Sequence, residues 1–507
     1  MTTFNETPCN VASLLLSCAH LERDALFYQD TVLSYRQLQV MVSQAQLELR
    51  ELGVGYQTPV ALSLPNIVAM PVYYYAIVSL GAICVPLNPL LSEREVRYHL
   101  EDSGAQLFIA WEGSRVMMED ISFEGVQQRI VGAETFATPL DMEALEEFAI
   151  EPVSVHAQDP AVILYTSGTT GQPKGAVLTH QNLLSNAMTV AEFFDYTPED
   201  VFFGGLPLFH SFGQTVSMNA VFAAGASVAL LPRFTPEAAI ELCVEADVSI
   251  IAAVPSMYAA MSASLEGQKS SVLMGKIRYG ISGGSPLLAS IHEDFYKLVG
   301  CHILEGYGLS EASPVVSFNQ PSRPPVVGSV GTALTGIRVQ VRDSNGEVLP
   351  AGAPGQLWVN GPNVMLEYWN NPEATSQSLS DGWLATGDIA TIDEQGNIFI
   401  VDRLKDMILR HGYSVYPREI EDVIATHPQV RMVAVVGRKD MRVGEEIYAF
   451  VLPRQQCSPS QEEALCLEVE HLCVQQLADY KRPRHYRVVD TLPLGATGKI
   501  LKRDLSQ

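Results

Sequence analysis

The sequence predicts a mixed fold, in which an α/β region is followed by a β region and then by a smaller α+β region. From about residue 30 to 300, short apolar runs alternate with helix-length segments, a pattern typical of mostly parallel sheets covered by helices. From about 325 to 400 the runs are separated by Gly and Asn turns, as in antiparallel strands. A length of 507 residues also exceeds what one core normally holds.

The expected strands of the α/β region are short and strongly apolar. They are VALSL (60–64), QLFIAW (106–111), AVILYT (161–166), SVALLP (227–232) and VSIIAAVP (248–255), with a helix expected at 236–246. Residues 52–92 contain no Asp, Glu, Lys or Arg, but five prolines interrupt them. We therefore expect a buried β-α-β unit there, with its helix at 67–80, and no membrane span.

The C-terminal hundred residues have the content of a separate small domain. MILRHG predicts a strand, a helix is expected to begin near Pro417, and VRMVAVVG and EEIYAFVLP predict two further strands. QEEALCLEVEHLCVQQLA predicts an amphipathic helix, and a short, partly basic helix is expected at the C-terminus. We place the domains at 1–401 and 406–507, joined by the segment DRLK at 402–405.

Charge and cysteine usage narrow the functional class. The formal charge of −25 argues against nucleic-acid binding, which needs a basic face. The eight cysteines include no C-x-x-C pair, so we expect a reducing cytoplasm, no zinc site and no disulfide framework. The N-terminus has no basic stretch before its apolar residues, which disfavours a signal peptide.

The run YTSGTTGQPKG at 165–175 follows an expected strand and is rich in hydroxyls and glycines. Such a turn offers backbone N–H groups and hydroxyls to phosphate oxygens. It does not match the Walker pattern G-x-x-x-x-G-K-[ST], because Gly175 follows Lys174. We interpret it as a phosphate-binding loop of another kind, although an exposed flexible turn uses the same residues.

Four further stretches carry residues suited to a nucleotide, and each has a simpler alternative. In EGYGLSEASP (305–314), Tyr307 could lie against a base and Glu311 could hold a metal ion, or the two could be a core tyrosine and a loop glutamate. WLATGDIA (383–390) offers Asp388 to ribose hydroxyls, although T-G-D is common in loops. DRLKDMIL (402–409) alone suggests a solvated linker, and Lys499 is either an exposed charge or a lysine delivered by domain motion.

A competing motif is GISGG at 280–284, which matches the G-x-S-x-G nucleophile turn of serine hydrolases. The chain continues with SPL, shows no HGGG-type oxyanion segment, and would leave the loop at 165–175 without a role. We keep the hydrolase as a remote alternative.

In order and spacing, the stretches YTSGTTGQPKG, LPLFHSFG, SGGSPL, EGYGLSEASP, TGD, DRLKDMILRHGYSVYPREIE and LPLGATGKILKR resemble the adenylate-forming superfamily of acyl-CoA synthetases, luciferases and peptide-synthetase adenylation domains. The resemblance covers nearly the whole chain. It implies a large N-terminal domain of two stacked α/β sheet subdomains plus a β subdomain, and a small mobile α+β C-terminal lid. It also implies that a carboxylate attacks the α-phosphate of Mg·ATP, giving an acyl-adenylate and pyrophosphate, and that a thiol then displaces AMP.

The resemblance assigns roles to individual positions. Lys499, Glu311, His210 and Lys174 would be catalytic, with Glu311 also binding Mg²⁺. The nucleotide would be held by Thr166, Ser167, Gly168, Thr169, Thr170, Gly171, Lys174, Gly283, Gly284, Ser285, Tyr307, Gly308, Ser310, Asp388, Arg403 and Lys499. The acyl pocket would comprise Ser211, Phe212, Val216, Gly283, Pro314 and Val315.

In this resemblance Lys405 is the hinge, about which the C-terminal domain would rotate to bring Gly412 and Tyr413 to the thiol channel. Two positions depart from the usual pattern. Ser310 replaces a threonine but keeps the hydroxyl, and the basic pair Arg410 and His411 precedes Gly412. We interpret that pair as surface charges, with contact to coenzyme A phosphates as the alternative.

The expected acyl-pocket residues are small or apolar, which favours an apolar acid, since an unpaired buried charge is costly. We expect a medium- or long-chain fatty acid, with an aryl acid as the alternative. The expected co-substrates are ATP, Mg²⁺ and coenzyme A, and the phosphopantetheine arm of an acyl carrier protein is the other candidate acceptor. The enzyme would be cytoplasmic, a monomer or homodimer, with peripheral membrane contact left open and no nucleic-acid partner.

Overall fold

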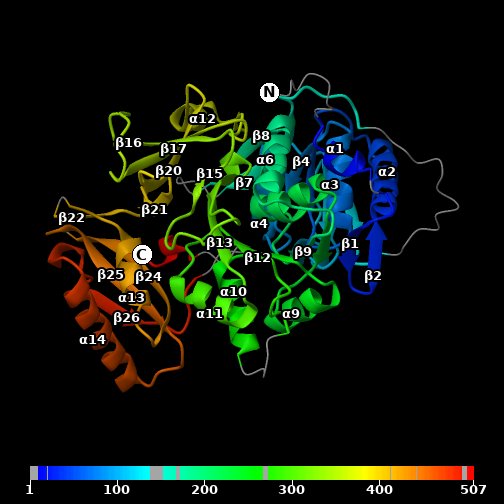
Figure 1. Ribbon diagram of the computed structural model, residues 1–507. Helices are drawn as coiled ribbons and strands as arrows, with labels where there is room; N and C mark the ends of the chain where they lie inside the picture. Colours follow the sequence, from blue (N-terminus) through cyan, green and yellow to red (C-terminus); the bar gives the residue numbers. More distant parts are fainter. Residues whose placement is uncertain are drawn as a thin grey trace. The chain divides into compact units, whose positions relative to one another are not determined.

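The computed structural model describes residues 10–19, 21–137, 152–166, 172–266, 272–411, 413–440, 442–493 and 500–506. The chain forms two compact units. The first comprises Met1–Val339 and Val359–Leu384, and the second Gln340–Trp358 and Ala385–Gln507. Figure 1 labels the elements of both units.

The first unit contains a seven-stranded sheet in the order β18-β8-β7-β4-β3-β5-β6. Its central strands are parallel, while β7 and β8 form an antiparallel pair. The expected β-α-β unit at 52–92 is confirmed, since β3 and β4 pair in parallel on either side of α3. The strands are β3 (Pro59–Ser63), β4 (Ile83–Pro86), β5 (Leu107–Trp111), β6 (Gln127–Val131), β7 (Pro160–Thr166), β8 (Lys174–Thr179) and β18 (Glu367–Tyr368).

A nine-stranded sheet in the order β15-β14-β13-β12-β11-β9-β10-β1-β2 forms the other layer of this unit. Strands β9 to β13 and β1 pair in parallel, so that β12 and β13 end at the same edge. The strands are β1 (Asp24–Tyr28), β2 (Thr31–Ser34), β9 (Val201–Gly204), β10 (Ser227–Leu230), β11 (Ile250–Ala253), β12 (Tyr279–Ser282), β13 (Ile303–Gly308), β14 (Val315–Phe318) and β15 (Thr332–Ala333).

Helix α3 (Ala69–Ser79) links the two layers, and all of its residues are buried. The Tyr75 hydroxyl donates to Asn219 Oδ1 at 2.7 Å, and the Tyr75 ring packs on Phe222, both from elements of the second layer. A helix that is apolar on every side is expected where sheets cover it from both sides. This confirms the two stacked subdomains.

The remaining helices of the first unit cover the outer faces or line the interior. They are α1 (Ser13–Leu16), α2 (Tyr35–Glu51), α4 (Glu93–Ser103), α5 (Arg115–Met118), α6 (His180–Phe193), α7 (Ser211–Gln214), the π-helix η2 (Thr215–Asn219), α8 (Ala220–Ala223), α9 (Pro236–Glu245), α10 (Pro255–Leu265), α11 (Ala289–Val299), the 3₁₀ turn η3 (Ser310–Ala312) and α12 (Pro372–Ser378). Local signals explain several of the starts. Thr235 caps α9 and Pro236 occupies its first turn, as the expected helix at 236–246 requires.

The strands expected between 325 and 400 are distributed over three sheets. Strand β15 extends the nine-stranded sheet and β18 the seven-stranded sheet, each by antiparallel pairing. The remaining strands form a sheet in the order β16-β17-β20-β19, with β21 paired to β20. They are β16 (Arg338–Arg342), β17 (Gly355–Asn360), β19 (Leu379–Ser380), β20 (Trp383–Ile392) and β21 (Ile398–Arg403). The pairs β19–β20 and β20–β21 are antiparallel, as expected. The β subdomain is smaller than its sequence range, because short strands also pair with open sheet edges.

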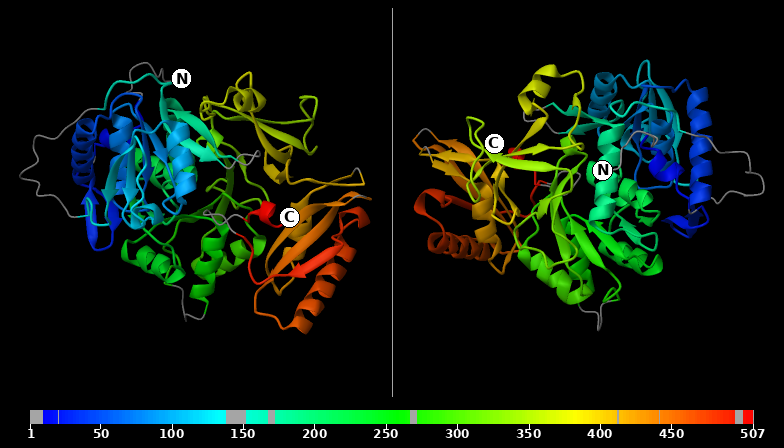
Figure 2. Two further views of the ribbon diagram at one scale, coloured as in Figure 1. Left: turned by 180° about the vertical axis from the view of Figure 1, so that it is seen from behind. Right: turned by 45° about the horizontal axis from the view of Figure 1, so that its top comes forward.

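The C-terminal part of the second unit is a sheet in the order β23-β22-β25-β24, with β26 paired to β25. Helices α13 and α14 pack together, and α14 lies along the sheet, as Figure 2 shows from two sides. The elements are β22 (Ile408–Arg410), β23 (Tyr413–Val415), α13 (Pro417–Ala425), β24 (Val430–Asp440), β25 (Gly444–Pro453), α14 (Pro459–Gln476), η4 (Asp479–Lys481), β26 (His485–Val488) and η5 (Lys502–Asp504). The expected strands and helices are confirmed, except that the described end of the chain forms a single 3₁₀ turn.

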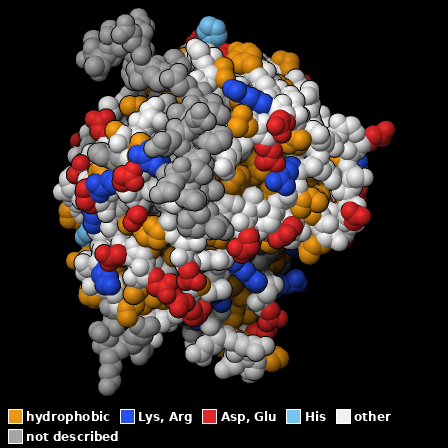
Figure 3. Space-filling view, turned by 90° about the vertical axis from the view of Figure 1, so that its right-hand side faces the viewer, with side chains coloured by type: hydrophobic (Ala, Val, Ile, Leu, Met, Phe, Trp, Pro, Cys, Tyr) orange, Lys and Arg blue, Asp and Glu red, His pale blue; other side chains and the backbone are white. Residues whose placement is uncertain are grey.

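Acidic, basic and apolar side chains are interspersed on the face of the molecule drawn in Figure 3. In the part of the chain that the structure describes, no helix combines the length and the apolar character needed to cross a membrane.

Candidate active site

The phosphate-loop candidate lies between two paired strands. Thr166 ends β7, Lys174 begins β8, and the two residues face each other across the antiparallel pair. The base of the loop is fixed from α4, because the Tyr98 hydroxyl donates to the Pro173 carbonyl at 2.7 Å and the Tyr165 hydroxyl to Asp102 Oδ2 at 2.6 Å. Ser167, Gly168, Thr169, Thr170 and Gly171 lie outside the described residues, as do Gly412 and Lys499.

Glu311 lies directly beside this base. Its Oε1 accepts hydrogen bonds from the Thr166 hydroxyl at 3.2 Å and from the Tyr368 hydroxyl at 2.9 Å. Its backbone carbonyl accepts from the Met365 N–H at 2.8 Å, which fixes the short turn η3. Burial, together with the Glu311 carboxylate, raises the pKa of the Tyr368 hydroxyl, so that Tyr368 stays a neutral donor.

Lys174 approaches the same tyrosine from the other side. Its Nζ lies 5.3 Å from the centroid of the Tyr368 ring, within the range of a cation–π contact. Tyr368 therefore connects the predicted metal-binding residue Glu311 with the predicted phosphate-binding residue Lys174. Tyr368 could not be predicted from the motifs, because 57 residues separate it from Glu311.

The predicted nucleotide-binding glycines follow the parallel strands β12 and β13. Gly283 and Gly284 come directly after β12, and Gly284 has a φ of +83°. Tyr307 and Gly308 end β13, and a Cβ on Gly308 would lie 2.2 Å from the Pro314 carbonyl oxygen, so no larger residue fits there. The carboxyl ends of adjacent parallel strands are where open α/β sheets bind ligands.

The predicted acyl pocket meets this edge through two serines. The Ser310 and Ser211 hydroxyls are 3.2 Å apart, and Ser211 begins α7. His210 precedes it and caps α7, with Nδ1 accepting from the Phe212 N–H at 3.3 Å. Phe212 reaches back to Gly283, where a Cβ would lie 3.3 Å from its ring.

The other predicted pocket residues, Val216, Pro314 and Val315, are buried in the same unit. Sequence reasoning missed one polar residue here. Gln214, the last residue of α7, is fully buried, and neither its amide oxygen nor its amide nitrogen has a hydrogen-bond partner among the described residues. A buried amide without a partner is costly, so water or a bound ligand is expected to satisfy it.

The remaining predicted site residues belong to the second unit. Asp388 on β20 and Arg403 on β21 are directly paired, and Asp388 Oδ1 lies 3.7 Å from Arg403 Nε. Lys405 is exposed in the turn after β21. Tyr413 is 57% exposed and stacks on Tyr480, with ring centroids 4.7 Å apart.

The interpretation of Arg410 as a surface charge is wrong. Arg410 is only 5% exposed, and its guanidinium forms a two-pronged ion pair with Glu446. The carboxylate partner lies 36 residues away on β25, so the sequence near Arg410 could not reveal it. His411 is exposed, as expected.

Comparison with known proteins agrees with this geometry. The family model described as AMP-binding enzyme matches residues 18–369, and the model for the AMP-binding enzyme C-terminal domain matches 419–499. The chain belongs to the AMP-binding enzyme family. This confirms the resemblance to adenylate-forming enzymes found in the sequence motifs.

Individual relatives extend over nearly the whole chain. A long-chain-fatty-acid–CoA ligase of Yersinia pestis is 34% identical, over 96% of this chain and 92% of its own. A feruloyl-CoA synthase of an Amycolatopsis species is 32% identical, over 95% of both chains. The crystal structure of ATP-bound MatB from Rhodopseudomonas palustris has a TM-score of 0.89 and 31% identity, covering 99% of this chain and 98% of that one.

Proposed function

We propose that this AMP-binding enzyme joins a medium- or long-chain fatty acid to coenzyme A in two steps that use ATP. The observation that carries the proposal is the adjacency of Ser310 and Glu311. Glu311 contacts the base of the phosphate loop through Thr166, while Ser310 contacts Ser211 at the start of the acyl wall. One short turn thus links the residues proposed for the phosphates to those proposed for the acid, as a reaction between a carboxylate and a phosphate requires.

In the first step, an oxygen of the acid attacks the α-phosphorus of ATP, the bond to the β-phosphate oxygen breaks, and pyrophosphate leaves. Thr166, Lys174 and the loop 167–171 hold the leaving phosphates, and Ser310 donates to the α-phosphate. Lys499 stabilises the negative charge that develops between carboxylate and phosphate, and His210 positions the acid at the head of α7. Gly283, Gly284, Ser285, Tyr307 and Gly308 form the adenine side, and Asp388 and Arg403 bind the ribose.

Glu311 fits the requirement for Mg²⁺. Its carboxylate is held by two neutral hydroxyls and no ion pair among the described residues includes it, so its negative charge is not neutralised within that part of the protein. Mg²⁺ prefers oxygen ligands and is commonly bound through one or two carboxylates plus substrate phosphates. When bound, it would neutralise phosphate charge.

In the second step, the thiol of coenzyme A attacks the acyl carbon and AMP leaves. We assign Lys405 as the hinge between the proposed domains 1–401 and 406–507, and Gly412 and Tyr413 as the residues beside the thiol. A cavity of about 290 Å³ in the second unit is a candidate place for the phosphates of the acceptor, since its lining includes Arg438, Arg487 and also Arg484, which is already paired with Asp479. These cations are concentrated in a protein of net charge −25.

The choice of acid rests on the pocket wall and on the relatives. Phe212, Val216 and Val315 are buried and offer no cation for a second carboxylate. The fatty-acid ligases among the relatives favour an alkyl chain, and the feruloyl-CoA synthase keeps an aryl acid as the second candidate. We further propose a cytoplasmic location, in keeping with eight cysteines whose spacing includes no C-x-x-C pair.

The test is pyrophosphate release with a panel of saturated acids from eight to eighteen carbons, benzoate and ferulate, followed by mass spectrometry of the products. Each acid is offered with coenzyme A or with a phosphopantetheinylated carrier protein. We expect acyl-CoA from the alkyl acids. Activity with aryl acids alone would contradict the proposed fatty-acid substrate, and activity with the carrier alone would contradict coenzyme A as the acceptor. Pyrophosphate release with none of the acids would refute the proposed enzymatic activity.

A further inference from the structure

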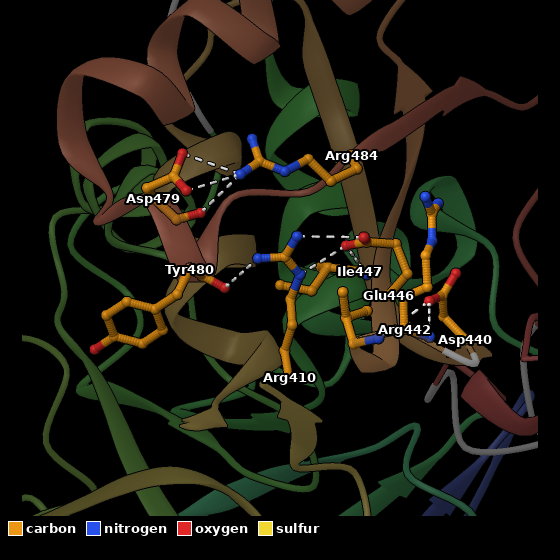
Figure 4. Close-up of polar contacts among 9 residues, drawn as sticks. Arg410, Asp440, Arg442, Glu446, Ile447, Asp479, Tyr480 and Arg484 are labelled. Atoms are coloured by element: carbon orange, nitrogen blue, oxygen red, sulfur yellow. Dashed lines mark hydrogen bonds and ion pairs between the residues drawn. The ribbon is translucent and has the colours of Figure 1, made fainter. Parts of the chain in front are cut away.

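Arg410, the last residue of β22, is the most deeply buried cation of a closed polar network in the second unit (Figure 4). Its Nε lies 2.8 Å from Glu446 Oε1 and its Nη2 lies 3.2 Å from Glu446 Oε2. The two side chains are 7% and 15% exposed. A planar guanidinium that meets a carboxylate at both oxygens fixes orientation as well as distance.

The same guanidinium reaches a third element. Its Nη1 lies 3.5 Å from the Tyr480 carbonyl oxygen in η4. The preceding residue, Asp479, is held by Arg484, with both carboxylate oxygens 3.0 Å from Nη2. The Tyr480 ring stacks on Tyr413, which pairs with Arg410 in the hairpin formed by β22 and β23. Arg410 therefore connects that hairpin to β25 and to η4.

The hairpin needs such an anchor because its own backbone is unfavourable. His411 has a φ of +52°, a left-handed conformation that costs a residue with a side chain about 1 kcal/mol or more. Among the described residues, β22 and β25 are in register at one pair, Arg410 with Gly444. The His411 N–H donates to the Val443 carbonyl at 2.7 Å, and the Leu409 N–H donates to Glu445 Oε2 at 2.7 Å.

The pair also persists at neutral pH. Burial acts to raise the pKa of Glu446, but hydrogen bonds from Arg410 and from the Ile447 N–H outweigh it and lower the pKa. Both partners are therefore charged, and replacing either one leaves the other as a buried, uncompensated charge.

We propose that Arg410 and Glu446 are a positioning pair that orients the β22–β23 hairpin and thereby places Tyr413 for the thiol step. The inference rests on the proposed function, in which Tyr413 lies beside the coenzyme A arm. Neither side chain is assigned a contact with substrate. The pair is expected to matter for thioester formation and not for formation of the adenylate.

The decisive variants are Arg410→Met and the isosteric Glu446→Gln, with Arg410→Lys as the conservative variant. The matched control is Arg431→Met, which removes an exposed arginine from β24. Each protein is assayed for acid-dependent pyrophosphate release and, separately, for thioester formation from supplied acyl-adenylate and coenzyme A. We expect thioester formation to fall about 10- to 100-fold and pyrophosphate release to stay within about twofold. Arg410→Lys should recover part of the loss, and Arg431→Met should match the wild type.

Hydrogen exchange provides a readout that does not depend on activity. The amides of Leu409 and His411 should exchange faster in Arg410→Met and Glu446→Gln, while those of the β24–β25 pair should not change. Unchanged amide exchange in the β22–β23 hairpin, or an equal loss of both half-reactions, would contradict the proposal that Arg410 and Glu446 position this hairpin. If wild-type protein releases no pyrophosphate with any acid, the proposed function fails, and the exchange experiment still decides whether the pair orients the hairpin.

Discussion

Glu311 in the first unit and Glu446 in the second are both half-buried carboxylates, but their partners differ in charge. Glu311 accepts from two neutral hydroxyls, those of Thr166 and Tyr368. Glu446 forms a two-pronged ion pair with the guanidinium of Arg410. Among the described residues, the first arrangement leaves a negative charge that a cation from outside can neutralise, whereas the second is already neutral. Charge balance within the protein thus separates a carboxylate suited to binding from one suited to holding structure.

The largest expected effect concerns Glu311, the carboxylate with no ion pair among the described residues. Glu311→Gln should lower acid-dependent pyrophosphate formation by about 100-fold or more, because the charge that would bind Mg²⁺ is lost. The amide oxygen can still accept from both hydroxyls, so thermal unfolding should change little. Glu367→Gln, an exposed site on β18, is the control. A wild-type rate in Glu311→Gln would contradict the assignment.

The next effect concerns a second buried ion pair of the second unit, between Lys502 and Glu421. Lys502 Nζ lies 2.8 Å from Glu421 Oε1, which also accepts from the Val435 N–H at 2.7 Å. Breaking this largely buried pair by Lys502→Met should reduce the free energy of unfolding by about 3 kcal/mol, measured by urea denaturation of the full chain. The exposed Lys439→Met should be neutral. Equal stability of the two variants would show that the ion pair between Lys502 and Glu421 does not stabilise this unit.

Acid should weaken the first unit before it opens the ion pair of the second. His180 is fully buried, its Nδ1 accepts from the Val11 N–H at 3.1 Å, and burial lowers its pKa to about 4. The unfolded chain, with a histidine pKa of about 6.5, binds more protons in this window, so stability is full above about pH 6.5 and is lost as pH falls toward 4.

Because His180 is protonated more readily in the unfolded chain, the free energy of unfolding should fall by about 2 kcal/mol between pH 7 and pH 5. Over the same range the Arg410–Glu446 pair should keep its contribution, since the pKa of Glu446 is lowered. The measurement is urea denaturation at several pH values, with His180→Gln as the variant expected to flatten the dependence. The same slope in both proteins would exclude His180 as the cause.

The smallest effect concerns the donor to Glu311. Tyr368→Phe removes one hydrogen bond, 2.9 Å long, from a neutral hydroxyl to the Glu311 carboxylate, but keeps the ring that Lys174 contacts. We expect the KM for Mg·ATP to rise about tenfold with little change in kcat, in line with about 1.5 kcal/mol for a hydrogen bond to a charged group. A large fall in kcat would instead indicate that Tyr368 takes part in the chemistry.

Much of the fold could be predicted because it depends on local patterns. Apolar runs became β3, β5, β7, β10 and β11, and Pro417 begins α13 as expected. The motifs also identified Thr166, Ser310 and Glu311, which the structure brings together with Ser211. What could not be predicted depends on contacts between distant residues, namely Tyr368 with Glu311 and Glu446 with Arg410. The same holds for the buried amide of Gln214, which has no hydrogen-bond partner in the part of the chain that the structure describes.

The most direct test of the contrast between the two carboxylates compares Glu311→Gln with Glu446→Gln in both half-reactions. The two changes are chemically identical, so charge at each site is the variable. We predict that Glu311→Gln loses pyrophosphate formation and retains thioester formation from supplied acyl-adenylate, and that Glu446→Gln does the reverse. The same pattern of loss in both variants would contradict the distinction between an open, ligand-binding carboxylate and a closed, positioning one.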